Sequence, residues 1–235
     1  MGQHNISSVA HLIAEPVRSV MLITLVDGSA MSAGALARAA GVTAQTASSH
    51  LAKLLDGGLL SVESKGRHRY YRLAGAHVSH VLESLATIGP VTPAWRHTPN
   101  RPAQALRFAR CCYDHLAGQI SIAVTQSMLT RGFIVEAGER QYAVTAPGCE
   151  WLQQLGIDMN DPAFSQASEH ARQCLDWTER QYHVAGPLGA RLMDAFLAWG
   201  WISRSSATRS VSVTALGWEG LKQHFGISRD ACVPG

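Results

Sequence analysis

The sequence predicts a mainly α-helical protein with small β-hairpins, an α+β fold divided into two domains. Three observations lead to this prediction. The 235 residues exceed the length of one average domain. Apolar residues recur at helical spacing in segments that end at glycine or proline, and short stretches of alternating apolar and polar residues lie between these segments.

The composition excludes several classes of protein. Hydrophobic residues make up 46% of the chain and charged residues 16%, which is typical of a folded protein and too apolar for a disordered one. There is no apolar run of membrane-spanning length and no signal-peptide pattern at the start, so we expect a cytoplasmic protein with no membrane partner. The odd number of cysteines, five, indicates thiols rather than a framework of disulfides.

The first part of the chain predicts three helices. Residues 6–14 and 17–26 have helical patterns that Pro16 separates, and a turn follows them. A short third helix comes next, with Leu36 and Ala40 on its buried side.

The fourth helix, which begins after Thr43, is the most informative. Thr43 is a suitable N-cap, because its hydroxyl accepts hydrogen bonds from the amides of the first turn. Ala47, Leu51 and Leu54 form one apolar stripe that faces a core. The other faces carry hydrogen-bonding side chains, which are Gln45, Thr46, Ser49 and Lys53.

A β-hairpin and a fifth helix follow. Leu60 and Val62 alternate with polar residues, as do Tyr71 and Leu73 on the return strand. The hairpin tip carries Lys65, Arg67, His68 and Arg69. The helix over residues 76–88 has an apolar face of Val78, Val81, Leu82 and Leu85.

Two helices joined at a glycine and followed by a cationic hairpin form a winged helix-turn-helix domain over residues 1–88. A helix with short polar side chains fits the major groove of DNA, and a cationic hairpin suits phosphates or the minor groove. Between residues 38 and 72 the chain has six lysines and arginines against two acidic residues. DNA binding is therefore favoured over a merely solvated polar face or a protein-binding module.

Two motifs carry a resemblance to a known family. The segment Ser48-Ser49-His50-Leu51 and the hairpin Gly66-Arg67-His68-Arg69-Tyr70-Tyr71 together resemble the ArsR/SmtB family of bacterial repressors, over about residues 6–88. The resemblance implies a homodimer joined through terminal helices, which binds a palindromic operator in double-stranded DNA and leaves it when an inducer binds.

The resemblance also implies roles for individual residues. Thr43 would hold a phosphate, and His50 fits the helix either as a DNA contact or as a packing residue. The side chains facing the bases would be Gln45, Thr46, Ser48 and Ser49. Further DNA contacts are expected from Lys53 on the same helix and from Lys65, Arg67 and Arg69 on the hairpin.

The metal sites of this family are not matched. Residues 34–40 contain no Cys-x-Cys motif. His77, His80 and Glu83 share a face of the last helix, where zinc between subunits is one interpretation, but the paired upstream ligands are absent. Solvated surface histidines are the favoured interpretation.

The proline-rich residues 89–102 predict a linker, and residues 103–235 predict a duplicated second domain. The repeats lie at about 103–158 and 163–228. Each repeat is expected to run helix, helix, hairpin, helix, as a reduced, winged-helix-like unit, and the two to pack about a pseudo-twofold axis. This domain resembles the C-terminal extension of some long ArsR-like regulators and is the candidate sensor.

Each repeat contains one cysteine and one histidine at corresponding positions, which are Cys112 and His115 in the first and Cys174 and His183 in the second. If the axis brings them together, they suit a thiophilic metal ion or trivalent arsenic, or a redox pair. Cysteines that simply pack in the core are the favoured interpretation. Five tryptophans between residues 151 and 218 suit an apolar pocket for an organic inducer, although core packing is again favoured. No definite cofactor is assigned.

The sequence thus predicts a DNA-binding transcriptional repressor with a sensor domain, and not an enzyme. One alternative is a constitutive DNA-binding or partner-recruiting regulator without a ligand. The other is a thiol enzyme with Cys112 as nucleophile and His115 as base, three residues apart on one helix. No oxyanion-donor or phosphate-loop pattern supports the enzyme.

Overall fold

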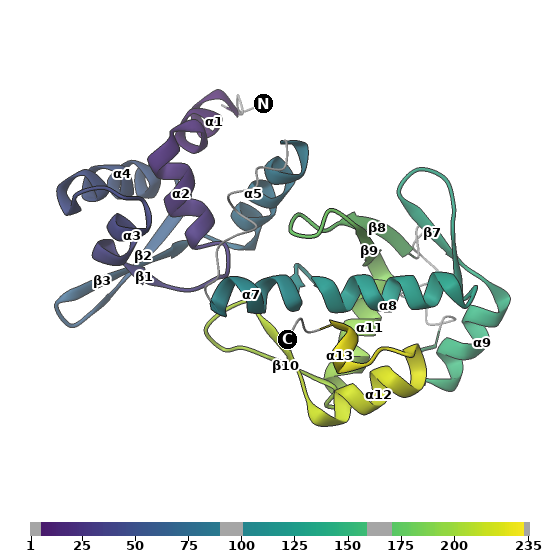
Figure 1. Ribbon diagram of the computed structural model, residues 1–235. Coiled ribbons are helices and arrows are strands. Elements are labelled where there is room, and N and C mark those ends of the chain that lie inside the picture. Colours follow the sequence, from purple (N-terminus) through teal and green to yellow (C-terminus); the bar gives the residue numbers. More distant parts are fainter. Residues whose placement is uncertain (1–5, 90–100, 159–170, 233–235) are drawn as a thin grey trace. The chain divides into compact units, whose positions relative to one another are not determined.

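The computed structural model describes residues 6–89, 101–158 and 171–232, which divide into two compact units (Figure 1). The first unit ends at Ile88 and the second begins at Gly89. Most of the predicted linker and the start of the predicted second repeat lie outside the described residues. No single helix in the described part is long and apolar enough to cross a membrane. Ile6–Ala14 and Pro16–Thr24 reach that size only together, across a bend of 87°.

The helices of the first unit follow the predicted order. They are α1 (Ile6–Ala14), α2 (Pro16–Thr24), α3 (Ala33–Ala39), α4 (Ala44–Asp56) and α5 (Ala76–Ile88). On α3 the buried side chains are Leu36 and Ala37. The prediction for Ala40 is wrong, because this residue is the half-buried C-cap at the end of the helix.

The junction of α1 and α2 is held by polar groups. The Glu15 carboxylate accepts hydrogen bonds from the amides of Val17 and Arg18, at 3.2 and 2.8 Å, and so caps α2. The buried Arg18 side chain in turn donates to the carbonyls of His11 and Leu12, at 2.8 and 2.6 Å. These bonds satisfy the last carbonyls of α1 and fix the angle at which α2 leaves it.

The wing is a three-stranded antiparallel sheet in the order β1-β3-β2. Its strands are β1 (Met31–Ser32), β2 (Leu60–Lys65) and β3 (His68–Leu73). Lys65 pairs with His68, so the turn consists of Gly66 and Arg67 alone, and Gly66 takes a φ of 60°. Val62 is 37% exposed, contrary to the alternating pattern, because burial falls off along β2 after its first residue.

The predicted apolar face of α5 is split. Val78 and Leu82 are buried, whereas Val81 and Leu85 are 46% and 47% exposed. The prediction of one buried face is therefore wrong for these two side chains, and α5 carries a second apolar stripe that faces outward.

The second unit repeats the order hairpin, helix, hairpin, helix, with an additional helix before the first copy. The first copy comprises α7 (Arg101–Phe108), β4 (Arg110–Cys112), β5 (His115–Ala117), α8 (Gln119–Thr130), β6 (Ile134–Glu136), β7 (Gln141–Val144) and α9 (Ala146–Gln154). The second comprises β8 (Ala171–Leu175), β9 (Tyr182–Ala185), α11 (Gly186–Ala198), β10 (Ile202–Arg204), β11 (Val211–Val213) and α12 (Ala215–Phe225), with α13 (Arg229–Cys232) after it. The expected order of helix, helix, hairpin, helix is thus wrong in one place, because a hairpin stands where the first helix of each copy was expected.

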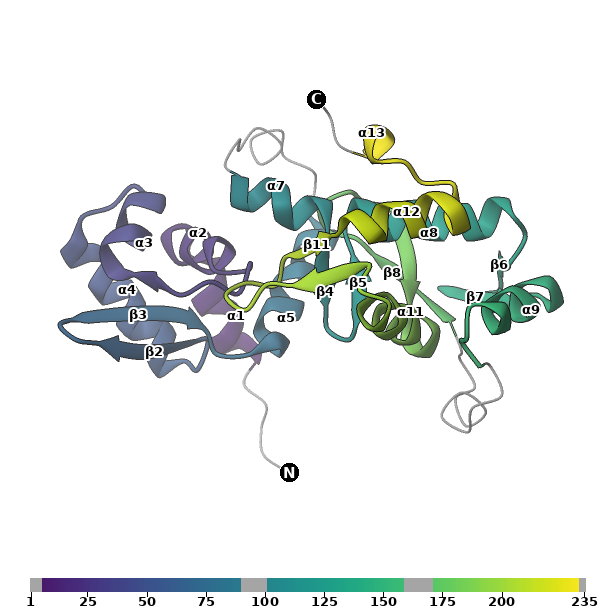
Figure 2. The same cartoon turned by 90° about the horizontal axis from the view of Figure 1, so that it is seen from below.

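The hairpins of each repeat lie beside hairpins of the other repeat, which we term the exchange of hairpins. One sheet has the order β6-β7-β8-β9, so the second hairpin of the first repeat pairs with the first hairpin of the second, through Gln141 and Arg172. On the other side, β11 lies beside β4, joined by a bridge between Ser210 and Arg110 (Figure 2). Both arginines stand two residues before the cysteine of their repeat, so the two pairings have the same register. The helices follow the same symmetry, since α8 packs against β9 and α11 packs against β5.

The two repeats also share a helix cap. The hydroxyls of Thr145 and Thr214 accept hydrogen bonds from the amides of Gly148 and Gly217, at 3.1 and 2.9 Å, and begin α9 and α12. A Cβ atom at either glycine would lie 2.0 Å from a carbonyl oxygen of the residue that precedes the hairpin. Equivalent residues therefore meet the same steric demand in both copies, as a pseudo-twofold arrangement requires.

The aromatic residues of the second unit form its core. Phe196 stacks on Trp201 with ring centroids 5.3 Å apart, and it meets Phe225 edge-on at 5.7 Å. Trp151 meets Phe225 edge-on at 5.2 Å. The favoured interpretation of these aromatic residues, core packing, is confirmed for this group.

A buried ion pair connects the repeats. Arg110 on β4 lies 3.0 Å from Asp176, which follows β8, and the two side chains are 1% and 0% exposed. Asp176 also accepts hydrogen bonds from the amide of Gly118 and from Thr178, at 2.8 and 2.7 Å. Burial raises the pKa of Asp176, but the Arg110 guanidinium and these hydrogen bonds outweigh burial and lower the pKa to about 2.

Replacing Arg110 with methionine should lower the free energy of unfolding of the second unit by about 3–5 kcal/mol, because the Asp176 carboxylate is left buried without its cation. Denaturant titration followed by tryptophan fluorescence measures this, since all tryptophans lie in the second unit. The matched control is Arg172→Met at the equivalent, exposed position, with an expected change within about 0.5 kcal/mol. Equal effects of the two substitutions would contradict the role given to the ion pair.

Candidate functional sites

The outward face of α4 carries every DNA-contact candidate predicted for that helix. Gln45, Thr46, Ser48, Ser49 and Lys53 are all exposed, as is Thr43 at the N-cap. The opposite face is held in place by Ala47, Leu51 and Leu54, each at most 1% exposed. The helix is therefore fixed by its apolar stripe while its polar face stays accessible.

The first turn of α4 already uses part of its polar groups. The Thr43 hydroxyl accepts from the amide of Thr46 at 3.2 Å and lies 2.9 Å from the Thr46 hydroxyl. The Ser48 hydroxyl donates to the carbonyl of Ala44 at 2.9 Å. The hydroxyls of Thr46 and Ser48 thus already have partners within the helix, which lowers the weight of these two residues as readers of bases relative to Gln45 and Ser49.

His50 packs within the domain. Its Nδ1 lies 3.2 Å from the Glu15 carboxylate, at the start of α2, and its side chain is 17% exposed. Desolvation raises the pKa of Glu15, but the amides of Arg18 and Val17 and the nearby His50 lower it, and the net shift is downward. Of the two interpretations of His50, packing is the one that the geometry supports.

The wing presents its cations to solvent. Lys65, Arg67 and Arg69 are exposed, and the guanidinium of Arg69 lies over the Tyr71 ring, 5.7 Å from its centroid. Glu63 pairs with Arg72 at 2.7 Å and lies 3.8 Å from Lys65. The acidic residue of the hairpin is thus partly neutralised by its neighbours, and the tip keeps a positive charge.

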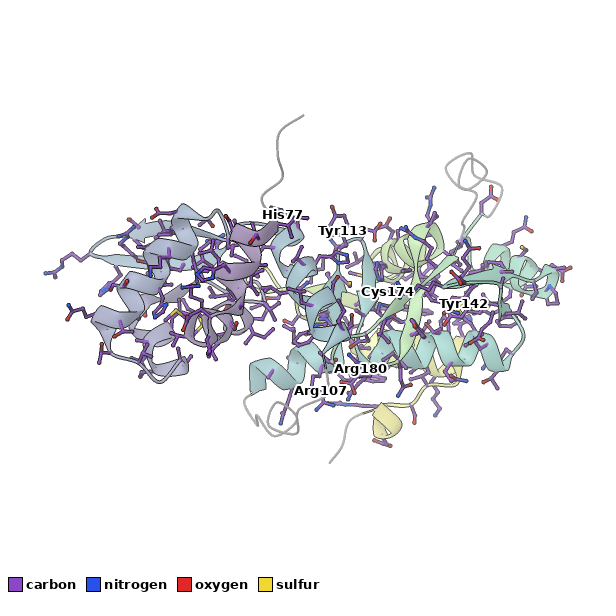
Figure 3. The ribbon with its side chains drawn as sticks, turned by 90° about the horizontal axis from the view of Figure 1, so that it is seen from above. His77, Arg107, Tyr113, Tyr142, Cys174 and Arg180 are labelled. Atoms are coloured by element: carbon purple, nitrogen blue, oxygen red, sulfur yellow. The ribbon has the colours of Figure 1, made fainter. Side chains whose placement is uncertain are left out.

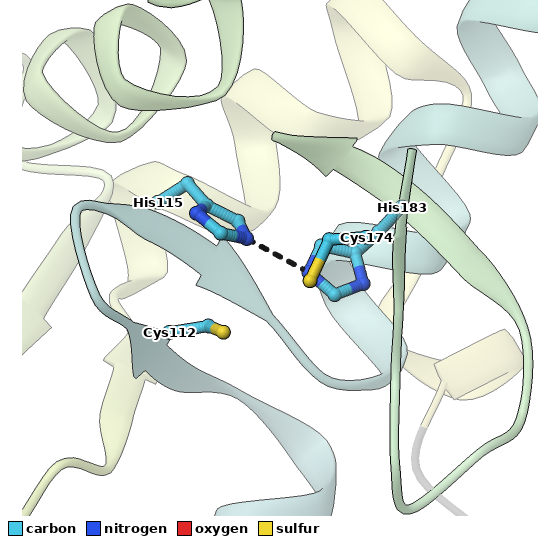
Figure 4. Close-up of side chains that lie close together, drawn as sticks. All are labelled: Cys112, His115, Cys174 and His183. Carbon is cyan, nitrogen blue, oxygen red and sulfur yellow. Dashed lines mark hydrogen bonds between the residues drawn. The ribbon is translucent and has the colours of Figure 1, made fainter. Parts of the chain in front are cut away.

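A second site lies inside the second unit, where two cross-strand pairs converge (Figure 4). Cys112 stands opposite His115 in the register of β4 and β5, and Cys174 stands opposite His183 in the register of β8 and β9. The expectation that Cys112 and His115 share a helix is therefore wrong, since a hairpin brings them together. Figure 3 shows Cys174 among the side chains of the second unit.

The four side chains, which we term the Cys/His cluster, offer ligand atoms that all lie within 4.8 Å of one another. Nε2 of His115 and Nε2 of His183 are 3.1 Å apart. Nδ1 of His115 lies 3.0 Å from the Asp114 carboxylate. His183 is fully buried, while Cys112 and His115 are 4% and 6% exposed.

The electrostatics of the Cys/His cluster disfavour a reactive thiolate. The Cys174 thiol and then burial raise the pKa of Cys112 to about 11, against the opposing effect of the two histidines. Burial lowers the pKa of His183, whereas Cys112 and Asp114 raise that of His115 in spite of its burial. Nucleophilic cysteines have lowered pKa values, so the raised pKa of Cys112 disfavours a thiol enzyme.

Comparison with known proteins supports the assignment of the first unit. Residues 13–63 match the family model described as a helix-turn-helix domain. Over 223 residues the chain is 38% identical to YdfF of Bacillus subtilis (strain 168), an uncharacterized HTH-type transcriptional regulator, and the match covers 95% of this chain and 98% of that protein.

Two solved structures each cover 37% of the chain. The transcriptional repressor BigR from Xylella fastidiosa is 25% identical and covers 37% of this chain and 88% of its own, with a TM-score of 0.34. The cadmium metal-sensor CMTR from Mycobacterium tuberculosis is 30% identical and covers 37% and 93%, with a TM-score of 0.32. Because YdfF matches over nearly the whole chain, this protein belongs to the helix-turn-helix transcriptional regulators, in the winged form typical of the ArsR/SmtB family that its sequence resembles.

Proposed function

We propose that this regulator is a repressor, which binds a palindromic operator in double-stranded DNA as a homodimer and leaves it when an inducer binds the second unit. The observation that carries the proposal is the accessible polar face of α4 beside a wing with an exposed cationic tip. A helix of this kind enters the major groove, and a hairpin of this kind contacts the phosphates beside it.

Gln45 and Ser49 are the base-reading residues of this proposal. Both are exposed, and they lie one turn apart on the same face of α4. A glutamine amide makes two hydrogen bonds to adenine, which distinguishes it from the other bases. Lys53, Arg67 and Arg69 supply contacts to phosphates, which position the helix without selecting a sequence.

The outward stripe of α5 is the proposed dimer contact. Val81, Leu85 and Ile88 recur at i, i+4 and i+7 and are 46%, 47% and 80% exposed. On α1, the first helix in the chain, Ile6 is 77% exposed. Apolar side chains of this exposure on terminal helices favour an interface, and a twofold dimer requires a palindromic operator.

The proposed sensor is the Cys/His cluster of the second unit. It is a group of four possible metal ligands, two from each repeat. A constitutive regulator would have no need for it, and a thiol enzyme is disfavoured by the raised pKa of Cys112. The inducer therefore reaches a site that lies in a different unit from the DNA-binding helix.

Replacing Gln45 or Ser49 with alanine should weaken binding to the protein's own upstream DNA by about 5- to 100-fold and relax selectivity, because a contact to a base edge is lost. Arg67→Ala should weaken binding to all sequences alike and reduce the salt dependence by about one phosphate contact.

Fluorescence anisotropy with specific and scrambled duplexes over a range of salt concentrations measures both effects. His50→Ala, on the packed side of the same helix, is the control and should keep the selectivity of the wild type. If the wild-type protein shows no sequence-selective binding even at low salt, the proposal fails.

Replacing Leu85 with aspartate should convert the dimer to a monomer at micromolar concentration, because a charge then lies in the centre of the outward stripe of α5. Sedimentation velocity gives the mass, and operator affinity should fall with it. Leu216→Asp alters a side chain of similar exposure, 54%, on α12 and should leave the dimer intact. A wild-type monomer, or a Leu85→Asp dimer, would show that this stripe is not the interface.

A further inference from the structure

The Cys/His cluster offers four possible metal ligands, two from each repeat. Each repeat supplies one cysteine and one histidine from opposite strands of one hairpin. We propose that Cys112, His115, Cys174 and His183 together bind one divalent ion of the zinc class, tetrahedrally, and that this ion fastens the two repeats to each other.

The spacing of the ligand atoms fits such an ion. Zn–N bonds of about 2.0–2.1 Å and Zn–S bonds of about 2.3 Å place tetrahedral nitrogen ligands about 3.3 Å apart and sulfur ligands about 3.8 Å apart. The two Nε2 atoms are 3.1 Å apart, and all four ligand atoms lie within 4.8 Å of one another. Closing a zinc site thus requires shifts of about an ångström or less in the side chains.

The polar contacts around the histidines point the same way. The Asp114 carboxylate holds Nδ1–H of His115, which leaves the lone pair on Nε2, the arrangement of a carboxylate–histidine–metal triad. His183 is fully buried, and its Nδ1 has no hydrogen-bond partner among the described residues. Nε2 of His183 faces Nε2 of His115. If neither nitrogen carries a proton, two lone pairs point at each other, and a cation between them would satisfy both.

The donor set selects the class of ion. Magnesium and calcium prefer oxygen ligands, and purely thiophilic species such as trivalent arsenic would leave both imidazoles unused. Two cysteines and two histidines are a frequent ligand set of structural zinc sites, and four protein ligands leave no open position for a reacting water. The ion therefore has a structural or regulatory role and not a catalytic one.

The charges balance when the ion binds. Each thiol loses its proton to solvent, both imidazoles bind through neutral nitrogen, and two thiolates neutralise the dication. The buried site then carries no net charge, which low-dielectric surroundings tolerate best. Because the ligands come from β4–β5 and β8–β9, the bound ion cross-links the hairpins that the two repeats bring together.

Titration of the reduced, metal-free full-length protein with Co²⁺ and Zn²⁺ tests the site. We expect one ion per chain, with the ligand-field bands of tetrahedral cobalt and thiolate charge-transfer bands, displaced by one equivalent of zinc. Cys174→Ser should weaken binding at least tenfold and lose half of the charge-transfer intensity, whereas Cys149→Ser, a cysteine outside the cluster, should match the wild type. Far-ultraviolet circular dichroism checks that each variant is folded. Absence of thiolate bands in the folded wild type, or equal affinity of both variants, would overturn the proposal.

The regulatory meaning of the ion rests on the proposed function and has its own readout. Operator affinity is measured by anisotropy with metal-free protein, with one equivalent of zinc, and with Cys174→Ser under both conditions. A zinc-dependent change in the wild type that is lost in Cys174→Ser supports the ion as inducer or corepressor. Zinc binding with unchanged operator affinity would contradict that role. Failure of every form to bind operator would contradict the proposed function, while cobalt titration would still decide on the metal site.

Discussion

The exchange of hairpins between the two repeats is the constraint on which the second unit depends. An isolated two-stranded hairpin is marginal in water, and its outer strand carries unpaired backbone groups. Here β7 pairs with β8, and β4 is bridged to β11, so each repeat completes the sheet of the other. Neither repeat could keep this packing alone, because α8 and α11 each cover a strand that belongs to the other copy.

The same exchange of hairpins explains why the Cys/His cluster and the Arg110–Asp176 ion pair lie between the two repeats. The first hairpins of the two repeats meet in the interior, and there Cys112 and His115 come against Cys174 and His183. The Arg110–Asp176 ion pair joins β4 to the segment after β8 and is thus a second contact between the two repeats. The Cys174 thiol and then burial raise the pKa of the Cys112 thiol, and burial lowers that of His183, so both shifts favour the neutral form of the group. The four possible ligands of the Cys/His cluster therefore lie between the two repeats, which depend on each other for their packing.

Much of the first unit could be predicted from the sequence. The Thr43 cap and the stripe of Ala47, Leu51 and Leu54 are local signals, and the structure confirms them. The strand β1 was missed because its two residues are too short for a periodic pattern. The exposure of Val81 and Leu85 could not be predicted, because a helical stripe shows that a face is apolar and not what covers it.

The elements of the second unit were harder to predict from the sequence than those of the first, for a physical reason. The repeat revealed which cysteines and histidines correspond, but strands of three to five residues give no reliable distinction between helix and hairpin. Cys112 and His115 therefore appeared as helical neighbours when they are a cross-strand pair. The partners of Arg110 depend on contacts across the two repeats, and no local pattern around this residue indicates a buried ion pair.

One metal ion bound between the two repeats would have a defined coordination shell. X-ray absorption spectroscopy at the zinc edge, on protein purified without a tag and loaded with one equivalent of zinc, measures that shell. We expect two sulfur ligands at about 2.3 Å and two imidazole nitrogens at about 2.0 Å. A coordination shell of oxygen atoms, or one without sulfur, would contradict it.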